Sequence, residues 1–378
     1  PVAYHPGGGL VAFGSGSEIL IADEYTGVIR RRLRGHGGAV WSVAWRGDGL
    51  WLASGSRDKT VRVWEAESGR LVRTLEGPGD GVWSVAWRGD GARLASGSGD
   101  NTVRVWDGES GRLWRTLEGH GNVVWSVAWR GDGARLASGS DDRTVRVWDG
   151  ESGRLLRTLE GHTGSVESVA WRGDGLWLAS GSRDRTVRVW EAESGRLVRT
   201  LEGHTGSVWS VAWRGDGARL ASGSGDRTVR VWDGESGRLL RTLEGHGDGV
   251  RSVAWRGDGA RLASGSADST VWVWDGESGR LLRTLEGHGD WVLSVAWRGD
   301  GAWLAASCAD GSMVIWDVER GERVATQWQF ADGAWLNQFP DQSYDGDAVG
   351  KSRLYFVDGW AAVPSRLYPE LDWTQRGG

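Results

Sequence analysis

A unit of 42 residues recurs seven times from Gly35 onward without any change of length. The copies begin at Gly35, Gly77, Gly119, Gly161, Gly203, Gly245 and Gly287. A unit this short cannot bury its own apolar face, so it is stable only when it stacks on its neighbours. The chain is therefore predicted to form one continuous array of repeats rather than two or three separate domains.

Each unit contains four short runs of alternating β-branched, aromatic and small residues. In the first copy the runs cover residues 40–45, 52–56, 61–64 and 71–75, and turns rich in Gly, Asp and Ser separate them. Alternation of this kind, cut by turn residues, is typical of half-buried β-strands joined by hairpins. We expect four antiparallel strands in every copy.

The ends of the unit carry a more specific signal. Most copies open with Gly-His, and about thirty residues later each closes with Trp-Asp or Trp-Glu. The closing pairs begin at Trp64, Trp106, Trp148, Trp190, Trp232, Trp274 and Trp316. This combination resembles the WD-repeat β-propeller family, and the near-identical copies and the tail look similar to bacterial multidomain members. The resemblance implies radial four-stranded blades around a central channel.

Residues 2–34 read as an imperfect copy of the same unit, with four strand-like runs and turn glycines. The predicted fold is therefore all-β, an eight-bladed propeller, with seven blades as the alternative. The expected organisation is a degenerate first blade over 1–34, seven repeats over 35–328 and a non-repeating extension over 329–378. We interpret this extension as a cap over the seam or one face, because exposed strand edges need covering.

The resemblance also implies a buried hydrogen-bonded network of His, Ser, Asp and Trp in each blade. The matching sets are His36, Ser54, Asp58, Trp64; His120, Ser138, Asp142, Trp148; His162, Ser180, Asp184, Trp190; His204, Ser222, Asp226, Trp232; and His246, Ser264, Asp268, Trp274. Two copies depart from the pattern, because Pro78 replaces the His and Ala306 replaces the Ser. We expect each of these two networks to lack a member and to be locally looser.

The histidines argue against catalysis. Six of the seven occupy the network position, and a His–Asp pair that recurs in every blade indicates structure rather than a catalytic base. One cysteine, Cys308, and no Cys/His cluster exclude a zinc site or a disulfide framework. No phosphate-binding loop or nucleophile elbow is present. We expect no enzyme activity, no metal and no cofactor.

The net charge and the hydropathy of the chain limit the classes of partner that it is expected to bind. The net charge is −5 and basic residues alternate with acidic ones, which argues against a nucleic-acid footprint. No apolar run is long enough for a membrane span, and no export signal opens the sequence, so we expect a cytoplasmic protein without membrane contact. Residue 1 is proline rather than methionine, which suggests an upstream domain.

Seven Arg-Gly-Asp triplets begin at Arg46, Arg88, Arg130, Arg172, Arg214, Arg256 and Arg298. Although such triplets suggest cell adhesion, each is followed by Gly between two predicted strands. Gly-Asp-Gly supplies the positive φ and side-chain capping that a tight hairpin requires. We interpret the triplets as turns.

The variable positions point to a binding surface. The opposite end of the strands carries the stretch after Gly-His, the second residue of the first strand, and the residue before the network Asp, and all three differ between copies. The predicted partner-binding residues are Trp41, Trp83, Trp125, Glu167, Trp209, Arg251, Trp291, Leu293, Arg57, Asp141 and Arg183. Trp and Arg dominate the energetics of many interfaces. Neutral drift and extra packing are the competing explanations.

These observations favour a non-enzymatic module that recognises a protein or peptide, or an upstream domain of the same polypeptide. The resemblance suggests a sensor or scaffold within a larger bacterial signalling or defence protein. The alternative is an amplified or engineered symmetrical scaffold with no natural ligand.

Overall fold

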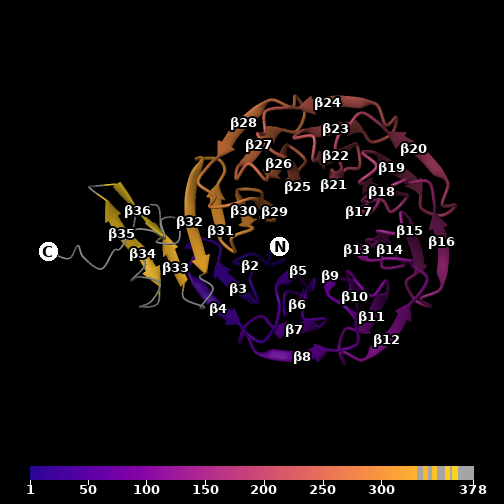
Figure 1. Cartoon of the computed structure of the whole chain (residues 1–378), viewed down its shortest axis with the longest axis horizontal. Coiled ribbons are helices and arrows are strands. Elements are labelled where there is room, and N and C mark those ends of the chain that lie inside the picture. The colour runs from indigo at the N-terminus through magenta and orange to yellow at the C-terminus, as the bar shows by residue number, and fades with distance from the viewer. Residues whose placement is uncertain (330–334, 339–342, 347–353, 358–359, 365–378) are drawn as a thin grey trace.

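The computed structural model is a closed ring of eight antiparallel sheets, each of which contributes a four-stranded blade (Figure 1). It describes residues 1–329, 335–338, 343–346, 354–357 and 360–364. Within each blade the strands follow one another in sequence order, and the first strand lies nearest the axis of the ring. The prediction of an all-β, eight-bladed propeller is confirmed.

Blades 1 to 4 are built from β1 (Val2–Tyr4), β2 (Leu10–Ser15), β3 (Glu18–Asp23), β4 (Ile29–Leu33), β5 (Val40–Trp45), β6 (Trp51–Ser56), β7 (Val61–Glu65), β8 (Leu71–Leu75), β9 (Val82–Trp87), β10 (Arg93–Ser98), β11 (Val103–Asp107), β12 (Leu113–Leu117), β13 (Val124–Trp129), β14 (Arg135–Ser140), β15 (Val145–Asp149) and β16 (Leu155–Leu159). Blades 5 to 8 are built from β17 (Val166–Trp171), β18 (Trp177–Ser182), β19 (Val187–Glu191), β20 (Leu197–Leu201), β21 (Val208–Trp213), β22 (Arg219–Ser224), β23 (Val229–Asp233), β24 (Leu239–Leu243), β25 (Val250–Trp255), β26 (Arg261–Ser266), β27 (Val271–Asp275), β28 (Leu281–Leu285), β29 (Val292–Trp297), β30 (Trp303–Cys308), β31 (Met313–Asp317) and β32 (Glu322–Gln329).

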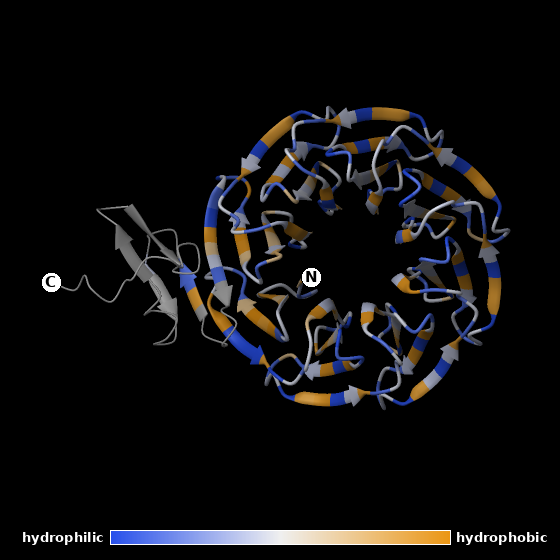
Figure 2. Cartoon of the chain, in the orientation of Figure 1, coloured by the Kyte–Doolittle hydropathy of each residue, from blue (hydrophilic) through white to orange (hydrophobic). Residues whose placement is uncertain are grey.

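The hydrophobic core is divided into clusters that join neighbouring blades. One cluster, for example, packs Ala53 and Val61 of blade 2 against Val82 and Leu94 of blade 3. The indole N–H of Trp87 donates to the carbonyl of Ala44 in the preceding blade at 3.1 Å, and the same bond recurs around the ring. Each blade therefore buries its apolar face only against its neighbours, as the short repeat requires. The outermost strands carry both apolar and polar residues (Figure 2).

The ring closes where blade 8 packs against blade 1, without exchange of a strand between them. The hydroxyl of Ser15 donates to the carbonyl of Gly311 at 2.7 Å across this junction. On the outer edge, β32 continues into β33 (Trp335–Gln338) and β34 (Tyr344–Gly346), which extend the sheet of blade 8 to six strands. The side-chain amides of Gln327 and Asn337 both donate to the carbonyl of Gly27 in blade 1. These contacts join the two ends of the repeat array.

The remaining described strands, β35 (Leu354–Val357) and β36 (Trp360–Pro364), form a separate hairpin. The boundaries proposed for the first blade, the repeats and the extension at 34 and 328 fall close to the ends of β4 and β32. Much of 329–378 lies outside the described residues, so the capping role of the extension stays a prediction. Among the residues that the structure describes, no helix is long and apolar enough to cross a membrane.

Candidate functional site on the loop face

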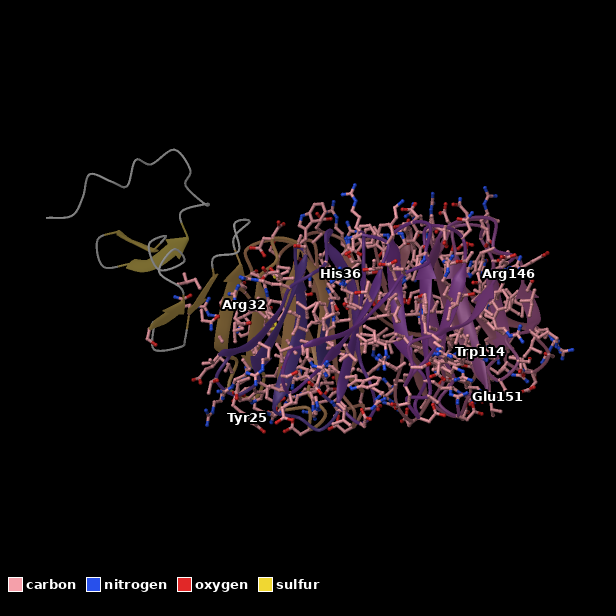
Figure 3. The ribbon with its side chains drawn as sticks, turned by 90° about the horizontal axis from the view of Figure 1, so that it is seen from below. Tyr25, Arg32, His36, Trp114, Arg146 and Glu151 are labelled. Atoms are coloured by element: carbon pink, nitrogen blue, oxygen red, sulfur yellow. The ribbon has the colours of Figure 1, made fainter. Side chains whose placement is uncertain are left out.

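The two faces of the ring carry different chemistry. We call the face that bears the stretches after Gly-His the loop face, and the face that bears the Arg-Gly-Asp turns the hairpin face. Seen from the side, His36 and Arg146 lie in the half toward the loop face, whereas Tyr25 and Glu151 lie toward the hairpin face (Figure 3).

A repeated ion pair occupies the hairpin face. The guanidinium of Arg88 contacts Asp90 at 2.8 Å and Glu151 of the next blade at 2.5 Å. Equivalent pairs between blades are Arg46–Glu109, Arg130–Glu193, Arg172–Glu235, Arg214–Glu277, Arg256–Glu319 and Arg298–Glu24. The Asp side chain also accepts the backbone N–H two residues later, and the following Gly49 has a φ of 74°, as a tight turn needs. These arginines are largely buried, so the triplets join blades and do not present an adhesion motif.

Beneath the loop face lie the His–Ser–Asp–Trp contacts. In blade 2 the indole N–H of Trp64 donates to Ser54 at 2.9 Å, Ser54 lies 2.8 Å from His36, and His36 lies 2.7 Å from Asp58. The same three contacts occur in blades 4, 5, 6 and 7. The imidazole of His36 has no exposed surface. A substrate therefore has no direct access to this imidazole.

The titration of these groups follows from their surroundings. Burial alone would raise the pKa of Asp58, but hydrogen bonds from Thr60, Gly37 and His36 lower it to about 2. Burial lowers the pKa of His36 and outweighs its hydrogen bond to Asp58. The pair is therefore a neutral imidazole that donates to a carboxylate at neutral pH.

Two blades depart from the pattern in different ways. In blade 3, where Pro78 replaces the His, Arg104 donates to Asp100 at 2.6 Å. The imidazole is missing from this blade, as the sequence indicates, but Arg104 of β11 in the same blade binds the carboxylate that the His binds elsewhere. In blade 8, where Ala306 replaces the Ser, the Nε2 atom of His288 and the indole N–H of Trp316 are buried without a hydrogen-bond partner among the described residues. Burial lowers the pKa of His288 to about 4.

The predicted binding residues of the first strands occupy one special backbone position. In each of blades 2 to 8 the pairing of the first two strands slips by one residue, and the skipped residue is the variable one. We call these residues the inner rim: Trp41, Trp83, Trp125, Glu167, Trp209, Arg251 and Leu293. A β-bulge leaves its extra residue out of the regular ladder and redirects its side chain. The inner rim is therefore set apart from the core by backbone geometry and is not drawn into it.

The aromatic members of the inner rim contact one another. The rings of Trp41 and Trp83 stack with centroids 3.6 Å apart, and Trp83 meets Trp125 edge to face at 4.4 Å. All three indoles are half-buried, and none belongs to a core cluster between blades. We call them the aromatic arc. The arc is a continuous apolar surface over blades 2 to 4.

The other predicted site residues form two further groups. Glu167 lies 2.6 Å from Arg183, and Arg183 lies over the ring of Trp125 at 5.9 Å. Across the axis, Arg251 lies between the rings of Trp209 and Trp291. Trp291 and Leu293 are 47% and 42% exposed, Arg57 is exposed, and Asp141 accepts a hydrogen bond from Asn122.

The sequence reasoning missed the glycines that accommodate the inner rim. A Cβ on Gly81 would lie 2.8 Å from the indole of Trp41, and a Cβ on Gly249 would lie 2.5 Å from that of Trp209. Each glycine belongs to the loop of the blade that follows its Trp. The Gly-Asp-Gly sequence of these two loops, one blade after a Trp, is the signal that predicts this contact.

Six residues on the loop face have positive φ although they are not glycine: Lys59, Asn101, Arg143, Arg185, Arg227 and Ser269. Each directly follows the network Asp, whose carboxylate accepts hydrogen bonds from the turn. Within the residues that the structure describes, no group of three or more His, Cys, Asp or Glu side chains is arranged to hold a metal ion.

The comparisons with known proteins agree with this architecture. The family described as "WD40: WD domain, G-beta repeat" matches residues 27–65, 69–107, 111–149, 153–191, 195–233, 237–275 and 279–317, which is more than half of the chain. Each match runs from the outer strand of one blade to the third strand of the next. Seven matches make eight blades here because β1 to β3 precede the first match and β32 follows the last.

Individual relatives match over short stretches only. Intraflagellar transport protein 122 homolog of Homo sapiens is 36% identical over 66 residues, which cover 18% of this chain and 5% of that protein. Periodic tryptophan protein 2 homolog of Schizosaccharomyces pombe is 42% identical over 66 residues, 17% of this chain and 8% of the relative. Vegetative incompatibility protein HET-E-1 of Podospora anserina is 51% identical over 53 residues, which cover 14% of this chain and 4% of that protein. The matches thus span less than a tenth of these relatives.

Proposed function

The chain belongs to the WD40 family, whose propellers are generally protein-interaction scaffolds, and we propose that it is a non-enzymatic module that binds a protein or peptide across the inner rim. The observation that carries the proposal is the placement of variable Trp and Arg side chains on bulges beside the axis, half-buried and outside the core. A Trp side chain loses little conformational entropy on binding and offers a large contact area, and both Trp and Arg are enriched among the residues that dominate binding energy.

The contrast with the hairpin face supports this assignment. There the same arginine and the same acidic partners recur from blade to blade and satisfy one another. On the loop face the equivalent positions differ in size, charge and aromaticity. A surface selected only for stability has no need for this variety, whereas a surface that recognises one partner does.

We further propose that the module is the sensor or scaffold part of a larger bacterial signalling or defence protein in the cytoplasm, and that its partner is another protein, a peptide or an upstream domain. The short matches to much longer relatives, one of them named for vegetative incompatibility, support a role within a multidomain protein. The lone buried cysteine is compatible with a reducing compartment.

A selection experiment tests the proposal. Wild-type protein is panned against a displayed library of random peptides, in parallel with a variant in which Trp41, Trp83, Trp125 and Trp209 are changed to Ala. The matched control changes Asp48, Asp90, Asp132 and Asp216 to Ala, in the same four blades on the hairpin face. Circular dichroism and urea unfolding establish that all three proteins fold cooperatively.

We expect the wild type and the hairpin-face control to enrich the same peptides and the Trp variant to enrich none of them. If no peptide is enriched on any protein, the ligand-free scaffold is the better description. If the control loses binding as the Trp variant does, the loop face has no special role.

A further inference from the structure

Arg251 differs from the other members of the inner rim in both charge and surroundings. It occupies the bulge of β25, the position that holds Trp in blades 2, 3, 4 and 6. The Cζ atom of Arg251 lies 4.0 Å from the ring centroid of Trp209 on one side and 5.4 Å from that of Trp291 on the other. The guanidinium is therefore held between two indoles, one from the preceding blade and one from the loop of the next.

The cation has no counter-ion among the described residues. No carboxylate oxygen of the described chain lies within 4.0 Å of it, and its Nε is buried without an acceptor. By contrast, Arg183 on the same face has Glu167 at 2.6 Å. Burial lowers the pKa of Arg251, and the more distant charges of Asp248 and Glu167 only partly offset this. Arginine nevertheless stays protonated at any physiological pH, so an incompletely satisfied cation remains here.

The neighbouring acids are already engaged. Asp248 accepts the backbone N–H of Gly249 at 2.6 Å, and Asp290 accepts that of Trp291 at 2.7 Å. These backbone contacts hold the two carboxylates within their own loops. Their negative charges also oppose a doubly charged phosphate, which proteins normally bind with several arginines. A single carboxylate suits a single guanidinium, because the two planar groups form a pair of parallel hydrogen bonds.

We propose that Arg251, held between Trp209 and Trp291, is the receptor for an acidic side chain of the bound peptide. This inference rests on the proposed function and adds the chemistry of the ligand. Contact with the two indoles replaces part of the water around the guanidinium, which strengthens the ion pair. Trp291 and Leu293 are exposed beside it and offer apolar contact to the residues that flank the acid. An acidic residue within the peptide has flanking residues on both sides that can contact Trp291 and Leu293. A C-terminal carboxylate has a flanking residue on one side only.

The test uses N-acetylated, C-amidated peptides taken from the selection on wild-type protein, with affinities measured by calorimetry. We expect Asp or Glu at one fixed position of the selected sequences. Changing that acid to its amide and the Arg251→Gln substitution should each weaken binding by about tenfold or more, and the two changes together should cost little beyond either one. Arg251→Lys should restore only part of the affinity, because lysine lacks the planar fork.

Arg227→Gln is the matched control, since that arginine is exposed on the same face but lies outside the inner rim and the predicted binding residues. The proposal is overturned if the selected peptides have no fixed acid, if Arg251→Gln weakens the acidic and amide peptides equally, or if only peptides with a free C-terminal carboxylate bind. Peptide binding that depends on the aromatic arc but not on Arg251 would overturn this inference alone. Failure to select any peptide would overturn the proposed function as well.

Discussion

The hairpin face and the loop face are built by the same 42-residue repeat, yet they differ in what the repeat preserves. On the hairpin face Arg46, Arg88 and Arg172 each contact the Asp two residues later and a Glu of the next blade. On the loop face the bulge position changes from Trp83 to Glu167 to Arg251. One face therefore joins the blades, whereas the contacts of the other face differ from blade to blade.

The ion pairs between blades also occur at the junction of blade 8 with blade 1. Arg298 of blade 8 contacts Glu24 of blade 1 at 3.4 Å, so the ring of ion pairs continues across the two ends of the array. The ring of ion pairs is interrupted between blades 1 and 2. There His5 occupies the position of the arginine and contacts the carbonyl of Gly49 at 3.0 Å. The hairpin face thus has one site where the repeated pair is replaced.

The largest effect is expected where the repeated pair closes the ring. Arg298→Ala leaves Glu24, which is 1% exposed, without its cation, and we expect a loss of about 3 kcal/mol in the free energy of unfolding. Arg130→Ala is the matched change in a regular blade. Its partner Glu193 is 62% exposed, so about 1 kcal/mol or less should be lost. Urea unfolding measures both, and equal losses would contradict a special role for the closing pair.

The next effect concerns the buried layer beneath the loop face. Asp142→Ala removes the acceptor of His120 and should cost about 2 kcal/mol. Asp100→Ala removes the acceptor of Arg104 and should cost a similar amount. Without Arg104, a smaller loss would be expected at Asp100, because Pro78 stands where the other blades have the His. A markedly smaller loss at Asp100 in thermal unfolding would show that Arg104 does not replace the imidazole energetically.

Lowering the pH should reduce the stability that the network aspartates contribute. The pKa of Asp58 and that of Asp100 are each lowered from 3.8 to about 2 in the fold. These carboxylates therefore take up protons near pH 4 in the unfolded chain but only near pH 2 in the folded chain. The stabilisation is complete above pH 4 and is lost as the pH falls through this window. Urea unfolding at pH 5 and pH 3 checks it, and Asp100→Asn should make the decline shallower.

A smaller effect, and a gain, is expected from repairing blade 8. Ala306→Ser places a hydroxyl where six other blades have one, at the position from which it bonds the network His and Trp in blade 2. We expect a stabilisation of about 1 kcal/mol, because two buried polar atoms gain a partner. The same change in the opposite direction, Ser138→Ala in blade 4, is the control. A loss of stability on Ala306→Ser would show that blade 8 has repacked around the alanine.

The sequence predicted the fold well because the repeat constrains it at every level. Strand alternation, turn residues and the fixed period all point to the same blade, and even the degenerate stretch before Gly35 follows it. The local replacements were harder to predict. Arg104 lies four residues after Asp100, and only the folded turn between β10 and β11 shows that its side chain reaches the carboxylate.

The candidate site was predictable in position but not in arrangement. Variation between copies identified Trp41, Trp83 and Arg251. The stack of Trp41 on Trp83 depends on the angle between neighbouring blades, and the sandwich around Arg251 depends on a loop of the next blade. Such contacts join residues about forty positions apart, and no local pattern encodes them. The bulge that sets these side chains apart was also invisible in the sequence.

The most direct test of the account compares Trp83→Ala with Asp90→Ala, which lie in the same blade on opposite faces. Trp83 is the centre of the aromatic arc, and Asp90 is half-exposed and contacts Arg88 and the backbone N–H of Ala92. Calorimetry with a peptide selected on the wild type should show a loss of about 1–4 kcal/mol in binding free energy for Trp83→Ala and no measurable loss for Asp90→Ala. Undiminished binding by a cooperatively folded Trp83→Ala protein, or an equal loss for both variants, would contradict the assignment of recognition to the loop face.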